Sequence, residues 1–158
     1  MSTERIARAL TPGELRLARH AFGDAIDYGR VTLRRDKWWW LQPAWVVMAP
    51  DGDIWFHPNG HDWSDDFSAA RPFLKGLFIH EMTHVWQVQQ GINLVVRRGI
   101  LARYDYLPLV PGKPFAAYGL EQQAEIVKDA FLKRLGMKVP GAPPLADYDA
   151  ILPFMPQV

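Results

Sequence analysis

The sequence contains no cysteine, and this absence excludes disulfide bonds, thiolate metal ligands and a cysteine nucleophile. It also has no apolar run that approaches the roughly 20 residues a membrane helix needs. Neither charge dominates, because 18 lysines and arginines stand against 17 acidic residues and the basic residues are scattered. The sequence therefore predicts neither a membrane nor a nucleic-acid partner, and any metal ion must be bound by histidine, aspartate or glutamate.

The length of 158 residues and the hydrophobic fraction of 49% predict one soluble globular domain over residues 1–158. Residues 1–9 are expected to be flexible, and their mixed charges do not resemble a cleavable signal peptide. We therefore expect the chain to be cytoplasmic as synthesised, with leaderless secretion left open. Residues 137–158 are rich in proline and predict an extended tail that packs on the body.

Turn formers and apolar periodicities predict an α+β fold. Thr11, Pro12 and Glu14 are typical of a helix start with a capping box, and this helix is predicted to run to about Asp27. Short segments rich in β-branched and aromatic residues predict a small antiparallel sheet. The sheet segments are residues 31–35, 44–48 and 54–57, and the further helices are residues 71–90, a short one within 92–107, and 116–135.

Tryptophan is abundant, and three tryptophans stand together at Trp38–Trp40. They predict either an aromatic platform for a peptide or a sugar, or rings that cover the core or an interface. Three of the five histidines precede residue 80. We expect His57 and His61 to lie on the surface or in a substrate cleft, and we assign no functional role to His20.

The predicted helix at residues 71–90 is apolar around almost its whole circumference, which indicates burial on most sides. Within it, His80-Glu81-Met82-Thr83-His84 forms an HExxH motif. Residues four apart lie about 40° apart around a helix axis, so both imidazoles project from one face and can share a metal ion. The alternative is that His80 and His84 are hydrogen-bonded core histidines.

A catalytic zinc site commonly takes a third protein ligand and keeps one position for water. No histidine follows His84, so the third ligand is predicted to be a carboxylate. The helix at residues 116–135 carries Glu121, Glu125 and Asp129 on one polar stripe. This stripe either supplies the ligand or is a solvated charged edge.

An HExxH motif followed by a helix with the pattern Glu-x-x-Ala-Glu resembles the gluzincin metallopeptidases. More closely, the sequence resembles the small bacterial Vgr-related zinc metallopeptidases that are associated with Rhs and type VI secretion systems. The segments that carry this resemblance are Leu10–Glu14, Phe22–Asp27, Phe78–Gln87 and Glu121–Ile126.

The resemblance implies a zincin-like α+β fold, in which a small antiparallel sheet packs on the buried HExxH helix and a second helix supplies the third ligand. It implies Zn²⁺ as the cofactor, bound by His80, His84 and Glu121. Glu125 would then accept the other N–H of a ligand histidine, although an aspartate is usual at this position in gluzincins. The resemblance also implies a secretion-apparatus or toxin partner.

These features predict a zinc-dependent hydrolase, a metallopeptidase that cleaves a peptide or amide bond in a peptide or protein substrate. Glu81 is expected to act as the general base toward the attacking water. Tyr118, Tyr104 and Tyr106 are candidates to donate a hydrogen bond to the oxyanion, and we assign Tyr118.

An extended substrate is expected to pair with the edge of the strand at residues 44–48 or 54–57. Two alternatives stay open. One is a zinc-binding but catalytically inactive module that is associated with a secretion or toxin-delivery system. The other is a structural domain that binds no metal.

Overall fold

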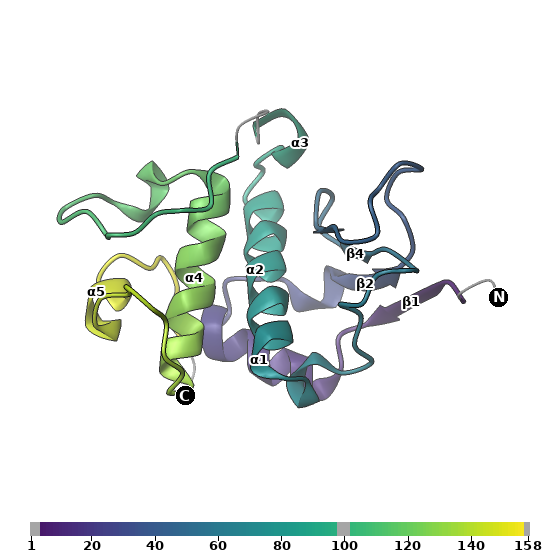
Figure 1. The fold of residues 1–158 in the computed structure, drawn as a ribbon, viewed down its shortest axis with the longest axis horizontal. Helices are drawn as coiled ribbons and strands as arrows, with labels where there is room; N and C mark the ends of the chain where they lie inside the picture. The colour runs from purple at the N-terminus through teal and green to yellow at the C-terminus, as the bar shows by residue number, and fades with distance from the viewer. Residues whose placement is uncertain (1–3, 98–101, 157–158) are drawn as a thin grey trace.

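The computed structural model describes residues 4–97 and 102–156, and two neighbouring helices, α2 and α4, form its centre (Figure 1). The sheet lies on one side of this pair, and α5 lies on the other side, beyond α4 (Figure 1). The strands are β1 (Ile6–Ala9), β2 (Thr32–Arg35), β3 (Val47–Met48) and β4 (Ile54–Phe56). The helices are α1 (Pro12–Phe22), α2 (Pro72–Gln89), α3 (Leu94–Arg97), α4 (Leu120–Arg134) and α5 (Leu145–Asp149).

Helix α1 begins as the sequence predicts but ends earlier. The Thr11 side chain accepts the backbone N–H of Glu14, and the Glu14 side chain accepts the backbone N–H of Thr11, which confirms the capping box. The prediction that the helix reaches Asp27 is wrong. Gly23 adopts a positive φ of 57° and its N–H bonds the Arg19 carbonyl, which closes the helix after Phe22.

The sheet is small, as predicted, but it is mixed and not antiparallel throughout. Its strand order is β1-β2-β4-β3. Strands β3 and β4 form the expected antiparallel hairpin pairing, whereas β2 and β4 run parallel. The parallel pairing arises because β3 takes the outer position and leaves β4 between β3 and β2. Strand β3 is therefore an edge of the sheet.

The N-terminal segment departs from the prediction of a flexible end. Residues Ile6–Ala9 form β1 and pair antiparallel with β2. Arg8 fixes this strand to α1, because its guanidinium bonds both carboxylate oxygens of the buried Glu14 at 2.8 and 2.9 Å. Residues 1–3 lie outside the described part of the chain.

Helix α2 is buried on most sides, as its apolar circumference predicts, with Phe78, Ile79, Met82 and Val85 inaccessible to solvent. Helix α4 starts after Gly119 and not at residue 116, because residues 115–117 form a separate 3-10 turn. The further short helix is α3, and residues 98–101 after it are not described. Among the described residues, no helix combines the length and apolarity needed to cross a membrane.

The tail packs on the body but is not fully extended, because it contains α5. Tyr148 of α5 is completely buried, and its hydroxyl lies 2.5 Å from the hydroxyl of Tyr106. Tyr106 in turn donates to Asp129 of α4 at 2.5 Å. Further along the tail, Phe154 packs edge-on against Phe22 at the end of α1. The Pro-rich tail is thus a fixed outer layer over α4.

Candidate metal centre

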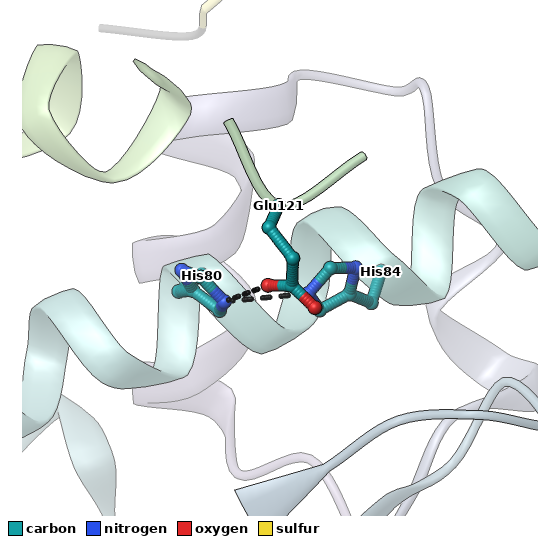
Figure 2. Close-up of side chains that lie close together, drawn as sticks. All are labelled: His80, His84 and Glu121. Carbon is teal, nitrogen blue, oxygen red and sulfur yellow. Dashed lines mark hydrogen bonds and ion pairs between the residues drawn. The ribbon is translucent and has the colours of Figure 1, made fainter. Parts of the chain in front are cut away.

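The HExxH histidines and Glu121 meet at one point between α2 and α4 (Figure 2). The Nε2 atoms of His80 and His84 lie 3.3 Å apart. The Oε2 atom of Glu121 lies 3.1 Å from each of them. All three side chains are buried. The carboxylate of this cluster thus comes from the neighbouring helix α4.

The outer nitrogen of each imidazole has a partner of its own. The Nδ1 atom of His84 lies 2.8 Å from Oε1 of Gln87, whose amide nitrogen donates to the Leu120 carbonyl and to Oε1 of Gln123. Because the Gln87 oxygen can only accept, Nδ1 of His84 must donate. The Nδ1 atom of His80 lies 2.9 Å from Oε1 of Glu125. Both imidazoles thus present their Nε2 atoms to the centre.

Glu125 accepts the outer N–H of His80 as a carboxylate. Burial raises the pKa of the Glu125 carboxyl, but the bonds to His80 and Lys128 outweigh burial and lower it below its usual value. Asp129, the next acid on the stripe, does not join the site. Its carboxylate accepts the Tyr106 hydroxyl, and burial raises the pKa of Asp129.

The donor set fits a zinc ion. Tetrahedral zinc with bonds of about 2.0–2.1 Å to nitrogen and oxygen requires neighbouring ligand atoms about 3.3 Å apart. The observed separations of 3.1, 3.1 and 3.3 Å match that requirement. Two imidazole lone pairs and a carboxylate oxygen this close together repel one another unless a cation or a proton lies between them.

The pKa of His80 also reflects the negative charge that gathers around this imidazole. Burial alone lowers the pKa of this imidazole. Its hydrogen bonds to Glu121 and Glu125 and the nearby charge of Glu81 outweigh burial and raise the pKa to about 9. Without a metal ion, the cluster therefore takes up a proton at neutral pH.

The cluster opens into a cleft of about 680 Å³. Glu81, the predicted general base, lines this cleft beside His80 and His84. The cleft is also lined by Trp38 and Trp39, whose side chains are partly exposed. The tryptophan segment and the HExxH helix therefore border the same space.

The structure does not bring Tyr118, our assigned oxyanion donor, to the cleft. Its hydroxyl accepts the backbone N–H of Val110 at 3.0 Å, in a buried position. Tyr106 is engaged with Asp129. Tyr104 is the tyrosine that lines the cleft, and its ring stacks on His80 with centroids 6.1 Å apart. Which tyrosine reaches a site is decided by loop packing, which residue spacing does not reveal.

The remaining histidines stay apart from the cluster. Nδ1 of His57 accepts the N–H of Asn59 in a turn, and neither His57 nor His61 lines the cleft. His20 packs edge-on against Phe131. Sequence reasoning missed Gln87. The sequence indicates this contact only through the position of Gln87 three residues after His84, a spacing at which a helix brings side chains together.

No family model matches the sequence. The chain is 43% identical over 137 residues to the type VI secretion system spike protein VgrG2b of Pseudomonas aeruginosa strain PAO1. This match covers 80% of the chain but only 13% of the spike protein. The solved effector domain of Pseudomonas aeruginosa VgrG2b superposes with a TM-score of 0.72 at 42% identity, over 81% of this chain and 75% of that one.

The chain belongs to the family of the VgrG2b effector domain. This relation confirms the resemblance to Vgr-related proteins. The zinc ion and the hydrolytic activity remain predictions, which depend on the chemistry of the His80, His84 and Glu121 cluster.

Proposed function

We propose that this domain is a type VI secretion-associated effector that hydrolyses peptide bonds at a zinc centre held by His80, His84 and Glu121. The observation that carries the proposal is the convergence of two Nε2 atoms and one carboxylate oxygen at 3.1–3.3 Å. The relation to an effector domain supports the biological setting. A secretion-apparatus partner is part of the same proposal.

Zinc bound by two imidazoles and a carboxylate supplies a Lewis acid that acidifies water and polarises a carbonyl. Glu81 lines the cleft next to His80, which supports its role in this proposal as the group that takes the proton of the attacking water. The same carboxyl group then returns the proton to the amine that leaves. Glu81 thus performs both proton transfers of the hydrolysis.

Two further side chains hold the imidazoles in their working orientation. Glu125 accepts from Nδ1 of His80, and Gln87 accepts from Nδ1 of His84. Each bond fixes the tautomer in which Nε2 keeps its lone pair. The carboxylate of Glu125 also stabilises positive charge on His80 and contributes to the raised pKa of this imidazole.

Strand β3 is the element that aligns the substrate in this proposal. It is an edge strand and it lines the cleft, so an extended peptide can add to it through backbone hydrogen bonds. The alternative edge at residues 54–57 is wrong, because β4 lies between β2 and β3.

The test compares three zinc-reconstituted proteins on a library of peptides from digested, unfolded protein. Wild type is expected to hold about one zinc per chain and to cleave peptides. Glu81→Gln keeps the zinc but loses at least a hundredfold in rate, because general acid–base catalysis contributes about 10²–10⁴-fold. Glu4→Gln, at an exposed position outside the cleft, serves as the matched control and behaves as wild type.

Each result has one meaning. Stoichiometric zinc without hydrolysis by wild type would replace the enzyme with a zinc-binding, inactive delivery module. Less than a tenth of an equivalent of zinc would remove the metal centre. A Glu81→Gln variant as fast as wild type would remove Glu81 from the mechanism.

A further inference from the structure

The segment between β2 and β3 places three tryptophans on the wall of the cleft that holds the histidines. Trp38, Trp39 and Trp45 line this cleft, and they are 37%, 42% and 81% exposed. We call these three residues the indole wall. Large apolar rings that gather beside a cleft and stay in water are typical of surfaces that bind another molecule. Nothing in the centre described above uses them.

The indole wall is held in place by the protein. Gln42 is buried beneath the segment, and its side-chain oxygen accepts the backbone N–H of Trp38 at 2.8 Å. Its amide nitrogen donates to the carbonyl of Val46 at 2.9 Å. One buried glutamine thus ties both ends of the segment together. The tryptophans are exposed in a fixed backbone, which lowers the entropic cost of binding a ligand.

The rest of the cleft favours the same kind of ligand. Met48 of β3, Phe73 and Leu77 of α2, and Leu132 of α4 add apolar surface to the lining. Because β3, α2 and α4 all contribute apolar side chains to the lining, a hydrophilic side chain of the ligand finds few hydrogen-bond partners in the cleft.

The charges of the lining disfavour acidic ligands. Asp62, Glu81, Glu121 and Glu125 border the cleft, and Lys128 is the one lysine or arginine among the described residues of its lining. Lys128 is already paired with Glu125. The carboxylates outnumber the available positive charge even when a divalent cation is added, so an aspartate or glutamate in the ligand meets repulsion.

We propose that the cleft selects extended peptide segments with bulky apolar or aromatic side chains, and without acidic ones, next to the bond that is cut. The indole wall is the surface that binds these side chains. An extended peptide on the edge of β3 points every second side chain to the same face, so alternate residues of the substrate reach the wall. This inference rests on the proposed peptide hydrolysis.

The first experiment maps cleavage sites. Zinc-reconstituted protein is incubated with peptides from a digested, unfolded proteome, and the residues on either side of each new terminus are counted. We expect enrichment of phenylalanine, tryptophan, tyrosine, leucine and methionine, and depletion of aspartate and glutamate, within three residues of the cut. Cleavage without such a preference, or a preference for acidic residues, would overturn the inference.

The second experiment assigns the preference to the indole wall. Replacing Trp39 and Trp45 together by alanine is expected to lower kcat/KM at least tenfold on a peptide with aromatic side chains, and less than threefold on its alanine-substituted counterpart. Trp40→Ala is the matched control, because Trp40 is 77% exposed on the same segment but does not line the cleft. An equal loss on both peptides, or no loss, would remove the wall from substrate selection.

A binding measurement separates this inference from the proposed function. Zinc-loaded Glu81→Gln is titrated with the aromatic peptide, an acidic peptide and a chito-oligosaccharide, with binding detected by calorimetry. Binding of the aromatic peptide at least tenfold tighter than the others supports the cleft preference even if wild type proves inactive. Equal binding of the peptides would overturn it, and so would tryptophan-dependent binding of the sugar alone.

Discussion

Gln87→Leu tests whether the metal centre depends on an amide that never faces the metal. The leucine keeps most of the volume of a completely buried side chain but removes three hydrogen bonds. It leaves the Nδ1–H of His84, the carbonyl of Leu120 and the side-chain oxygen of Gln123 without that partner. Partners that orient a ligand histidine contribute about 10–100-fold to metal affinity, which corresponds to roughly 1.4–2.7 kcal/mol.

The same substitution also costs stability. Each buried group that loses its hydrogen-bond partner costs about 1–3 kcal/mol. The bonds to His84 and Gln123 are buried, whereas the bond to Leu120 is only partly buried, so the two buried groups lower the free energy of unfolding of the zinc-free protein by about 2 kcal/mol or more. Metal affinity is measured by competition with a chelator at fixed pH, and stability by thermal or denaturant unfolding without zinc. Gln90→Leu, at an exposed position one residue beyond α2, is the control and should change neither quantity.

Gln87→Glu separates the orienting role from the packing role. A glutamate still accepts the N–H of His84, but it cannot donate to Leu120 or Gln123. We expect zinc affinity near that of wild type together with a loss of stability similar to that of the leucine variant. If Gln87→Leu keeps wild-type zinc affinity while it destabilises the fold, the orienting role is refuted and Gln87 is only a link between α2 and α4.

The remaining predictions concern the ligands and the helix that carries them. Glu121→Ala should weaken zinc binding more than Glu125→Ala, whose cost is about 10–100-fold, and the reverse order would make Glu125 the ligand. Burial lowers the pKa of His80, but the neighbouring carboxylates outweigh burial and raise it to about 9. Protonated His80 therefore stabilises the zinc-free protein fully below about pH 6.5, and this stabilisation is lost as the pH rises through about 9. The melting temperature of the zinc-free protein should fall over that interval, while zinc affinity rises as the competing proton leaves. A flat profile for both would contradict the raised pKa. Gly76→Ala should raise the free energy of unfolding by up to about 1 kcal/mol, because the added methyl group meets Leu132 and Lys128 at an acceptable 3.4 Å in a helix interior. A lower melting temperature for this variant would show that the α2–α4 contact cannot accept the methyl group.

The sequence predicted the features that depend on residues close together along the chain. The HExxH histidines share a face because four residues make about one helical turn, and Thr11 caps α1 through a bond that spans three residues. The spacing of Glu121, Glu125 and Asp129 indicated that this helix could supply the third ligand, and the resemblance favoured Glu121 among them. The short distances of 3.1 Å require α2 and α4 to pack side by side, which no local pattern encodes.

The features that sequence reasoning missed depend on contacts between distant segments. The residues of β1 become a strand because β2 offers its edge and Arg8 bonds Glu14. The parallel pairing of β2 with β4 depends on which strand takes the edge position of the sheet. The hydrophobic pattern of a three-residue strand is too short to predict that position. The role of Gln42 was also not predicted, because no local pattern shows that its side chain bonds both Trp38 and Val46.

The proposed metal centre and the indole wall belong to different parts of the fold. The hydrogen bonds to the outer nitrogens of the two imidazoles lie within α2 and α4, because Gln87 and Glu125 accept them and Gln87 itself bonds Leu120 at the start of α4. The indole wall depends on Gln42 and the segment between β2 and β3. Under the proposed function, a substitution in that segment is therefore expected to change which peptide is bound without moving His80, His84 or Glu121. A shift of α4 against α2, by contrast, would change the distances between His80, His84 and Glu121 themselves. Under the proposed function, we therefore expect related domains to differ in substrate more readily than in the residues of this cluster.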